Sequence, residues 1–411
     1  MATLDTLPDE VLESILTDVV DDEGGLLFSV AFAGPAAASA VLLVSRRWRA
    51  TARIWTHVRV HLDAELADRS AQVFARAVDA LQRSGDLSLR IELRYEARHI
   101  ASFRAYAPTQ DLDLGPLMRT SARWETADLY IPDACYGSPA FQAMRGALPR
   151  LRALSISVTQ LNPTLYVLPE AIDTFSDCPT LESVTVGNSI LYPLLNLPWA
   201  NLKDLTLHGL SVDEVILRLQ VCAVLERLTV HVIPQAMSIN PTVCMPFIHP
   251  TIRVLRIAHS SFDTTRGELL KRLQLPSLAE LSLTFKRELL TQWSQKALAE
   301  FLVRSNQTRP DVGPCASGNS NLTSLTLRRP NLGYNQLIDL LKLTPTLISF
   351  TLADGRPDID QWQEHDEEPW RPTPSTDTLP VDAIFRALGA PGGEDGEVNK
   401  PDVVLVPISP S

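Results

Sequence analysis

The amino-acid sequence predicts an α/β solenoid, in which parallel strands form a sheet and helices cover its outer side. Two observations lead to this fold class: a short apolar pattern recurs along the middle of the chain, and segments between its copies have the apolar spacing of amphipathic helices. The chain has 411 residues, of which 45% are hydrophobic and 21% are charged, as in ordinary soluble globular proteins. This composition excludes wholesale disorder, collagen-like repeats and a polytopic membrane protein.

Two short helices are expected near the N-terminus, within residues 1–60. Pro8 suits the first turn of a helix, where its missing N–H would be unpaired anyway. An apolar stripe at helical spacing follows, at Leu12, Ile15, Leu16, Val19 and Val20. A second helix is expected from Ala40 to Trp55. Because such short helices cannot bury their stripes alone, they need a partner or the rest of the chain.

An uncharged stretch of 22 residues, Gly24 to Ser45, lies between and overlaps these helices. Its length alone would let it span a bilayer, so a membrane-anchored receptor is one alternative. Gly34-Pro35 interrupts its middle, however, and we interpret residues 21–40 as an Ala/Gly-rich loop that leads into the second helix. A membrane is therefore not expected as a partner.

Residues 61–123 are expected to form an α/β connecting region. The segment His57-Val-Arg-Val-His61 has the alternation of a strand, and a helix from Ala64 to Ser84 is closed by Gly85. A second alternating strand is predicted at Leu87–Leu93. Arg123-Trp124 then opens the first repeat.

The repeat itself is an apolar residue followed by apolar residues three and five positions later. The last two positions are two residues apart, so they share one face of a strand. The copies are Leu151/Leu154/Ile156, Leu181/Val184/Val186, Leu202/Leu205/Leu207, Leu225/Leu228/Val230, Ile252/Leu255/Ile257, Leu278/Leu281/Leu283, Leu322/Leu325/Leu327 and Leu347/Phe350/Leu352, with a weaker first copy at Trp124/Ala127/Leu129.

The copies begin 21 to 30 residues apart, except for one interval of 44. This spacing is typical of leucine-rich repeats or slightly longer, and residues 124–353 are therefore predicted to form a leucine-rich-repeat solenoid. Helices are expected between strands at Val212–Leu219, Glu268–Leu273 and Gln336–Leu343. Five copies have a proline two residues before the strand pattern, which closes the preceding helix: Pro149, Pro179, Pro250, Pro276 and Pro345. An ordinary α/β sheet of unrelated units is the alternative.

The positions that alternate with the buried ones should form the open face of the sheet. Its centre has many Ser and Thr residues, which a solvated sheet prefers anyway, so they have no functional weight. Larger polar groups near this row are the candidate substrate-binding residues, because solenoids bind partners on this face. They are Tyr130, Asp204, His208, Arg227, His231, Arg256, Glu280 and Arg328.

The charge is concentrated in the C-terminal tail. Residues 354–411 contain 13 acidic and 4 basic side chains, a net charge of −9, and the whole chain has a net charge of −11. Nucleic-acid binding is not expected, because it needs a basic face. We expect a largely disordered, acidic and Pro-rich tail, in which the apolar run Val403–Val406 could alternatively begin a further repeat.

The sequence lacks the common motifs of catalysis and metal binding. The chain has no P-loop, dinucleotide-binding, zinc-protease or nucleophile-elbow motif, and its five cysteines form no CxxC pair. Cys178 and Cys222 come just before repeat strands and are interpreted as core residues, and His57 and His61 as solvated or packed side chains. We expect no enzyme activity, cofactor or metal. The acidic N-terminus shows no secretory signal, so a cytoplasmic or nuclear location is expected.

At the N-terminus, L-P-D-E-V-L-x-x-I (Leu7 to Ile15) followed by V-S-R-R-W-R (Val44 to Arg49) resembles an F-box. The resemblance implies docking on a Skp-family adaptor within a cullin–RING ubiquitin ligase. The two parts of the motif are separated by more residues than in most F-boxes. This comparison implies that the Ala/Gly-rich loop at 21–40 is an insertion. The residues implied in adaptor binding are Leu7, Pro8, Val11, Leu12, Ile15, Leu16, Val44 and Trp48.

With the repeats, the chain is similar to F-box/leucine-rich-repeat proteins of the expanded fungal F-box type. Such a resemblance implies a substrate-recognition subunit of a Skp–cullin–F-box ligase, in which a small all-α F-box docks the adaptor and the repeats bind a protein substrate of unknown identity. The alternative is a repeat scaffold with a degenerate F-box that binds a partner without ubiquitin transfer.

Overall fold

The structure is a computed structural model that describes residues 26–29, 56–63, 67–96, 114–158, 171–187, 191–232, 246–259, 264–284, 295–306, 321–328, 334–353 and 402–405. The chain divides into two compact units, residues 1–205 and residues 206–411. The division falls within strand β7 (Asp204–Leu210).

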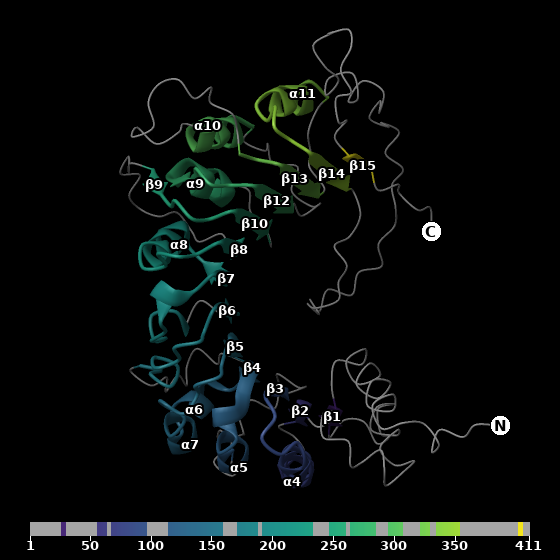
Figure 1. The fold of residues 1–411 in the computed structure, drawn as a ribbon, viewed down its shortest axis with the longest axis vertical. Coiled ribbons are helices and arrows are strands. Elements are labelled where there is room, and N and C mark those ends of the chain that lie inside the picture. The colour runs from purple at the N-terminus through teal and green to yellow at the C-terminus, as the bar shows by residue number, and fades with distance from the viewer. Residues whose placement is uncertain are drawn as a thin grey trace, which may run out of the picture. The chain divides into compact units, whose positions relative to one another are not determined.

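The first unit contains a parallel sheet whose strands follow one another in chain order (Figure 1). These are β1 (Leu26–Ser29), β2 (His57–Asp63), β3 (Leu89–Glu96), β4 (Trp124–Ile131), β5 (Ala153–Val158) and β6 (Ser183–Val186). Its helices are α4 (Ala67–Arg83), α5 (Gly115–Met118), α6 (Asp133–Tyr136) and α7 (Pro139–Gln142), with short 3-10 helices at Ser121–Arg123 and Trp199–Asn201. Gly85 closes α4 with a positive φ of 57°, which glycine adopts without strain.

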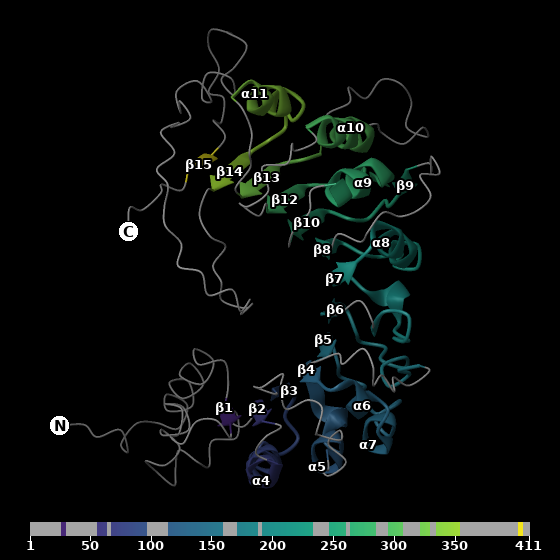
Figure 2. The same ribbon diagram turned by 180° about the vertical axis from the view of Figure 1, so that it is seen from behind.

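The second unit repeats this scheme. Its parallel strands are β8 (Arg227–Val232), β10 (Val254–His259), β12 (Glu280–Thr284), β13 (Ser324–Arg328), β14 (Ser349–Ala353) and β15 (Asp402–Leu405). The helices are α8 (Val212–Leu219), α9 (Thr264–Arg272), α10 (Gln295–Asn306) and α11 (Tyr334–Lys342). In Figures 1 and 2 they lie on the same side of the strands. A separate pair joins β9 (Phe247–Ile248) to β11 (Leu273–Gln274). An α/β chain built on a large parallel sheet is compatible with a repeat solenoid.

The apolar triplets form the core, as the sequence predicts. Each copy contributes one strand, and equivalent residues are aligned across strands, for example Leu228, Leu255 and Leu281. All members of the nine triplets are buried, with the exception of Leu352, which is half-buried on β14. Parallel sheets need such burial on their helix-covered face, where apolar area removed from water contributes about 25 cal/mol per Å².

A side-chain hydrogen-bond ladder joins successive repeats. In several copies the residue just before the first apolar residue of the triplet donates to a backbone carbonyl of the preceding repeat. The donors are Thr180 to Leu151 (2.9 Å), Thr251 to Leu225 (2.7 Å), Ser277 to Pro250 (2.6 Å), Asn321 to Pro276 (2.8 Å) and Thr346 to Leu322 (3.0 Å). These hydrogen bonds satisfy carbonyls at the turns before the strands, where no ladder partner exists.

A row of backbone hydrogen bonds also runs along the first unit, formed by the residue that follows the first apolar residue of each triplet. Arg152 N–H donates to the carbonyl of Glu125 (2.8 Å), Glu182 N–H to that of Arg152 (2.9 Å), and Lys203 N–H to that of Glu182 (2.8 Å). The side chains in this row alternate in charge. Lys203 Nζ lies 2.9 Å from Glu182 Oε1.

Two features differ from the sequence-based expectation, and a third agrees with one of its alternatives. Strand β1 lies inside the stretch 21–40 that was expected to be a loop, because the apolar run Leu26–Ser29 pairs with the edge of β2. The sheet begins before the expected first repeat, since β3 pairs with β4 across the anticipated boundary at residue 123. Within the tail, β15 pairs with β14 and aligns Val403 with Phe350, as in the alternative in which the apolar run Val403–Val406 begins a further repeat.

Several expectations concern residues outside the described ones. All adaptor-facing candidates, from Leu7 to Trp48, and most of the expected disordered tail lie there. Within the described ranges, no helix is long and apolar enough to cross a bilayer.

Replacing Leu281 by Ala should lower the free energy of unfolding by about 2–5 kcal/mol, because the fully buried side chain would leave a cavity. Leu217→Ala is the matched control, since Leu217 is 58% exposed on α8 and its loss should cost less than about 0.5 kcal/mol. Urea unfolding of both variants measures the difference. Equal costs at the two positions would contradict the assignment of Leu281 to the core.

Replacing Thr251 by Val should cost about 1 kcal/mol, because the valine keeps the shape but cannot donate to the Leu225 carbonyl. Thr229→Val, on the half-buried open face of β8, serves as the control for the same chemical change. If both substitutions change the unfolding midpoint equally, the ladder makes no specific contribution.

Candidate functional site

The open face of each sheet displays the side chains that alternate with the buried apolar ones. In the first unit, one row aligns Arg59, Glu92 and Asp128 with Ser155 and Thr185 across β2 to β6. The next row aligns His61, Arg94, Tyr130 and Ser157. Charged groups therefore gather over β2–β4 and hydroxyl groups over β5–β6.

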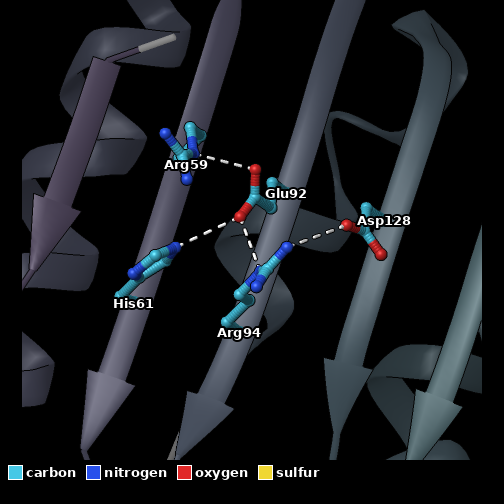
Figure 3. Close-up of polar contacts among 5 residues, drawn as sticks. All are labelled: Arg59, His61, Glu92, Arg94 and Asp128. Atoms are coloured by element: carbon cyan, nitrogen blue, oxygen red, sulfur yellow. Dashed lines mark hydrogen bonds and ion pairs between the residues drawn. The ribbon is translucent and has the colours of Figure 1, made fainter. Parts of the chain in front are cut away.

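The charged part is a connected network, which we call the Glu92 cluster: Arg59, His61, Glu92, Arg94 and Asp128 (Figure 3). Glu92 lies at its centre. Its carboxylate accepts from Arg59 Nε (2.8 Å) and His61 Nε2 (3.2 Å), and Arg94 Nε lies 2.7 Å from Oε1. Arg94 also reaches toward β4, where its Nη2 is 3.7 Å from Asp128 Oδ2.

The two carboxylates of this cluster are held differently. Burial alone would raise the pKa of Glu92, but the hydrogen bond from His61 and the charges of Arg94 and Arg59 outweigh it and lower the pKa to about 2. Burial raises the pKa of Asp128, because the hydrogen bond with Ser155 and the charge of Arg94 compensate only in part. Glu92 is thus a firmly ionised centre, and Asp128 is a carboxylate whose charge is poorly stabilised.

The Glu92 cluster was not identified from the sequence, apart from the neighbouring candidate Tyr130. Both strands were expected, and the alternation of the first places Arg59 and His61 on one face, whereas Arg94 lies one residue beyond the expected end of the second at Leu93. That Arg59 lies beside Glu92 depends on the register between β2 and β3, which no motif reveals. The sequence signal that could have indicated the Glu92 cluster is the presence of charged residues at alternate positions in both strands.

In the second unit, the structure brings two pairs of predicted residues together. His208 and His231 stack with ring centroids 4.0 Å apart and planes 10° from parallel. Arg256 binds Glu280, with Nη2 at 3.0 Å and Nε at 3.3 Å from Oε1. Thr229, two residues before His231 on β8, is aligned with Arg256.

The remaining candidates are spread over the faces. Arg227 is the first residue of β8 and is exposed, whereas Arg328 is the last residue of β13. Because β8 and β13 are separated by β10 and β12, the two arginines lie about 14 Å or more apart. Asp204 begins β7, and Tyr130 on β4 is 37% exposed. Arg227 and Arg328 therefore do not form one site.

Burial keeps the stacked histidines uncharged. It lowers the pKa of His208 to about 3, an effect to which the neighbouring His231 adds, and it also lowers the pKa of His231. At neutral pH the pair is therefore an aromatic contact between β7 and β8 and not a cationic patch.

The cysteines that were expected in the core are indeed buried. Burial raises the pKa of Cys178 to about 11 and that of Cys222 to about 12, so both remain thiols at neutral pH. Among the described residues, no three His, Cys, Asp or Glu side chains are grouped so that they could hold a metal ion.

Replacing Glu92 by Gln should lower the free energy of unfolding near neutral pH by on the order of 3 kcal/mol, from the depressed pKa. The stabilisation is complete above the ordinary glutamate value of 4.5 and is lost as the pH falls toward about 2. The variant should therefore converge with the wild type in stability only as the pH falls to about 2 and below.

Urea unfolding at several pH values measures this convergence. Glu182→Gln is the control, because Glu182 is an exposed carboxylate paired with Lys203 and should change the pH dependence less. A constant difference between wild type and Glu92→Gln at every pH would contradict the proposed electrostatic role.

No protein-family model matches the chain, and a search of the curated proteins found no similar sequence. The F-box-like motif lies outside the described residues, so it rests on the sequence alone.

Proposed function

We propose that this chain is the substrate-recognition subunit of a Skp–cullin–F-box ubiquitin ligase. In this role the N-terminal segment docks a Skp-family adaptor, and leucine-rich repeats bind the protein to be modified. The observation that carries the proposal is a two-part motif, Leu7 to Ile15 and Val44 to Arg49, in front of a sheet built from repeated strands. The chain would act in the cytoplasm, the nucleus or both.

The sheet supports the binding half of this proposal. Consecutive parallel strands present side chains at a spacing of about 4.8 Å, so an extended partner can be contacted by many repeats at once. Polar groups with fixed geometry, such as the Arg256–Glu280 pair and the Glu92 cluster, lie on this face. The chain would contribute binding and positioning alone, and the transfer of ubiquitin would be performed by the other subunits.

The double substitution Leu7→Ala and Pro8→Ala should abolish co-purification of a Skp-family adaptor, because both residues belong to the docking motif. The chain offers a matched control, since the same tetrapeptide, D-T-L-P, recurs at Asp377–Pro380. Leu379→Ala with Pro380→Ala should leave adaptor binding unchanged. Co-expression with the adaptor, followed by affinity purification, measures both.

The result separates the proposal from its alternative. Wild-type protein that does not retain the adaptor would support a repeat scaffold with a degenerate F-box. Adaptor binding that survives the Leu7/Pro8 substitutions would show that the motif is not the docking site. Circular dichroism of each variant verifies that the sheet remains folded.

A further inference from the structure

Arg94 is held in place on one side and presents donors on the other. Its Nε lies 2.7 Å from Glu92 Oε1, in an ion pair that lacks hydrogen-bond geometry but holds the guanidinium beside Glu92, whereas the approach of Nη2 to Asp128 is loose at 3.7 Å. The Arg94 side chain is 40% exposed. A guanidinium has five N–H donors in a planar fork that suits a carboxylate, so an anchored but exposed arginine is prepared to bind one.

The groups beside Arg94 are suited to a peptide. Tyr130 is aligned with Arg94 on the neighbouring strand, and Ser157 with Tyr130 on the next. Tyr130 is 37% exposed and offers a flat apolar ring with a polar end. An exposed aromatic beside an arginine is a common composition for the centre of a protein-binding surface.

Asp128 would compete with a bound carboxylate for Arg94, because its Oδ2 lies 3.7 Å from Arg94 Nη2. Its side chain is 40% exposed, and its charge is poorly stabilised because burial and Glu92 oppose the help of Arg94, Arg59 and Ser155. These are the groups that face it from β2, β3 and β5. A second carboxylate at Arg94 would disfavour the charge of Asp128 further, and a proton taken up from solvent would turn Asp128 into a hydrogen-bond donor.

We propose that Arg94, Tyr130 and Asp128 form a docking site for an acidic segment of a protein partner, in which Arg94 binds one Asp or Glu carboxylate and a protonated Asp128 donates to it. The proposal deepens the function proposed above, because it names the chemistry of the bound protein. A phosphate group fits less well, since the ionised Glu92 would repel its charge of nearly −2 more strongly than the single charge of a carboxylate.

Selection of random peptides on the full-length chain tests the site. The enriched peptides should share an Asp or Glu, and replacing that residue by Asn or Gln should abolish binding. Arg94→Gln should weaken the best peptide about ten- to a hundredfold, and Arg94→Lys less, because lysine keeps the charge without the fork. Arg76→Gln, the same change on the exposed side of α4, should have no effect.

The role of Asp128 is tested by the pH dependence of peptide affinity and by a variant that should bind more tightly, whereas Arg94→Gln should bind more weakly. Wild-type affinity should rise as the pH is lowered from neutral, by at most about tenfold per unit for one proton. Asp128→Asn should bind more tightly than wild type near pH 7.5 and should lose this pH dependence, because the amide donates without a proton. Damage to the fold would weaken binding, so a gain cannot arise from misfolding.

The proposal is overturned if enriched peptides share no acidic residue, if Arg94→Gln binds them like the wild type, or if Asp128→Asn binds more weakly. Tighter binding of a phosphoserine peptide than of its glutamate counterpart would also overturn it. Adaptor co-purification with the same variants separates this outcome from the proposed function, because the Arg94 and Asp128 variants should all retain the adaptor.

Discussion

The in-register pairing of parallel strands through their buried apolar residues is the constraint on which the other features depend. Leu228, Leu255 and Leu281 are aligned across three strands, and the same alignment continues through Leu325. Because side chains alternate along a strand, burying these leucines under the helices determines which residues face outward. A slip of one residue would bury the charged positions and expose the core.

The Glu92 cluster is a direct product of that register. Arg59, Glu92 and Asp128 come from three strands and are widely separated in the sequence, yet they occupy one row of the sheet. Their energetics follow from partial burial: Glu92 accepts from Arg59 and His61 and lies beside the charge of Arg94, whereas Asp128 has to share Arg94. Two carboxylates of similar intrinsic acidity therefore differ in how easily they accept a proton or a competing anion.

The repeats could be predicted from the sequence because their spacing carries the information. The helix at Val212–Leu219 has the predicted bounds, since Ser211 and Glu214 form a capping box that marks its start. His208 and His231 each directly follow the last apolar residue of a triplet, so the repeat pattern predicts that they lie side by side on the open face. Features that follow from the sequence spacing can be predicted without knowledge of the tertiary structure.

Other features could not be predicted, because they depend on contacts between repeats. The side-chain hydrogen-bond ladder uses single Thr, Ser or Asn residues, such as Thr180 and Thr251, which also suit an ordinary turn. Strand β1 consists of four residues whose pairing is decided by the free edge of β2. The distance between Arg227 and Arg328 follows from the strand order and their places along the strands, which composition does not contain.

The alternating row in the first unit limits how this part of the chain could change in length. Glu125, Arg152, Glu182 and Lys203 place opposite charges on neighbouring repeats. Loss or gain of one repeat inside the row would bring two like charges together, which is destabilising, whereas loss or gain of two would preserve the alternation. Duplication or deletion of repeats in this row is therefore subject to a parity rule, and even steps are favoured over odd ones.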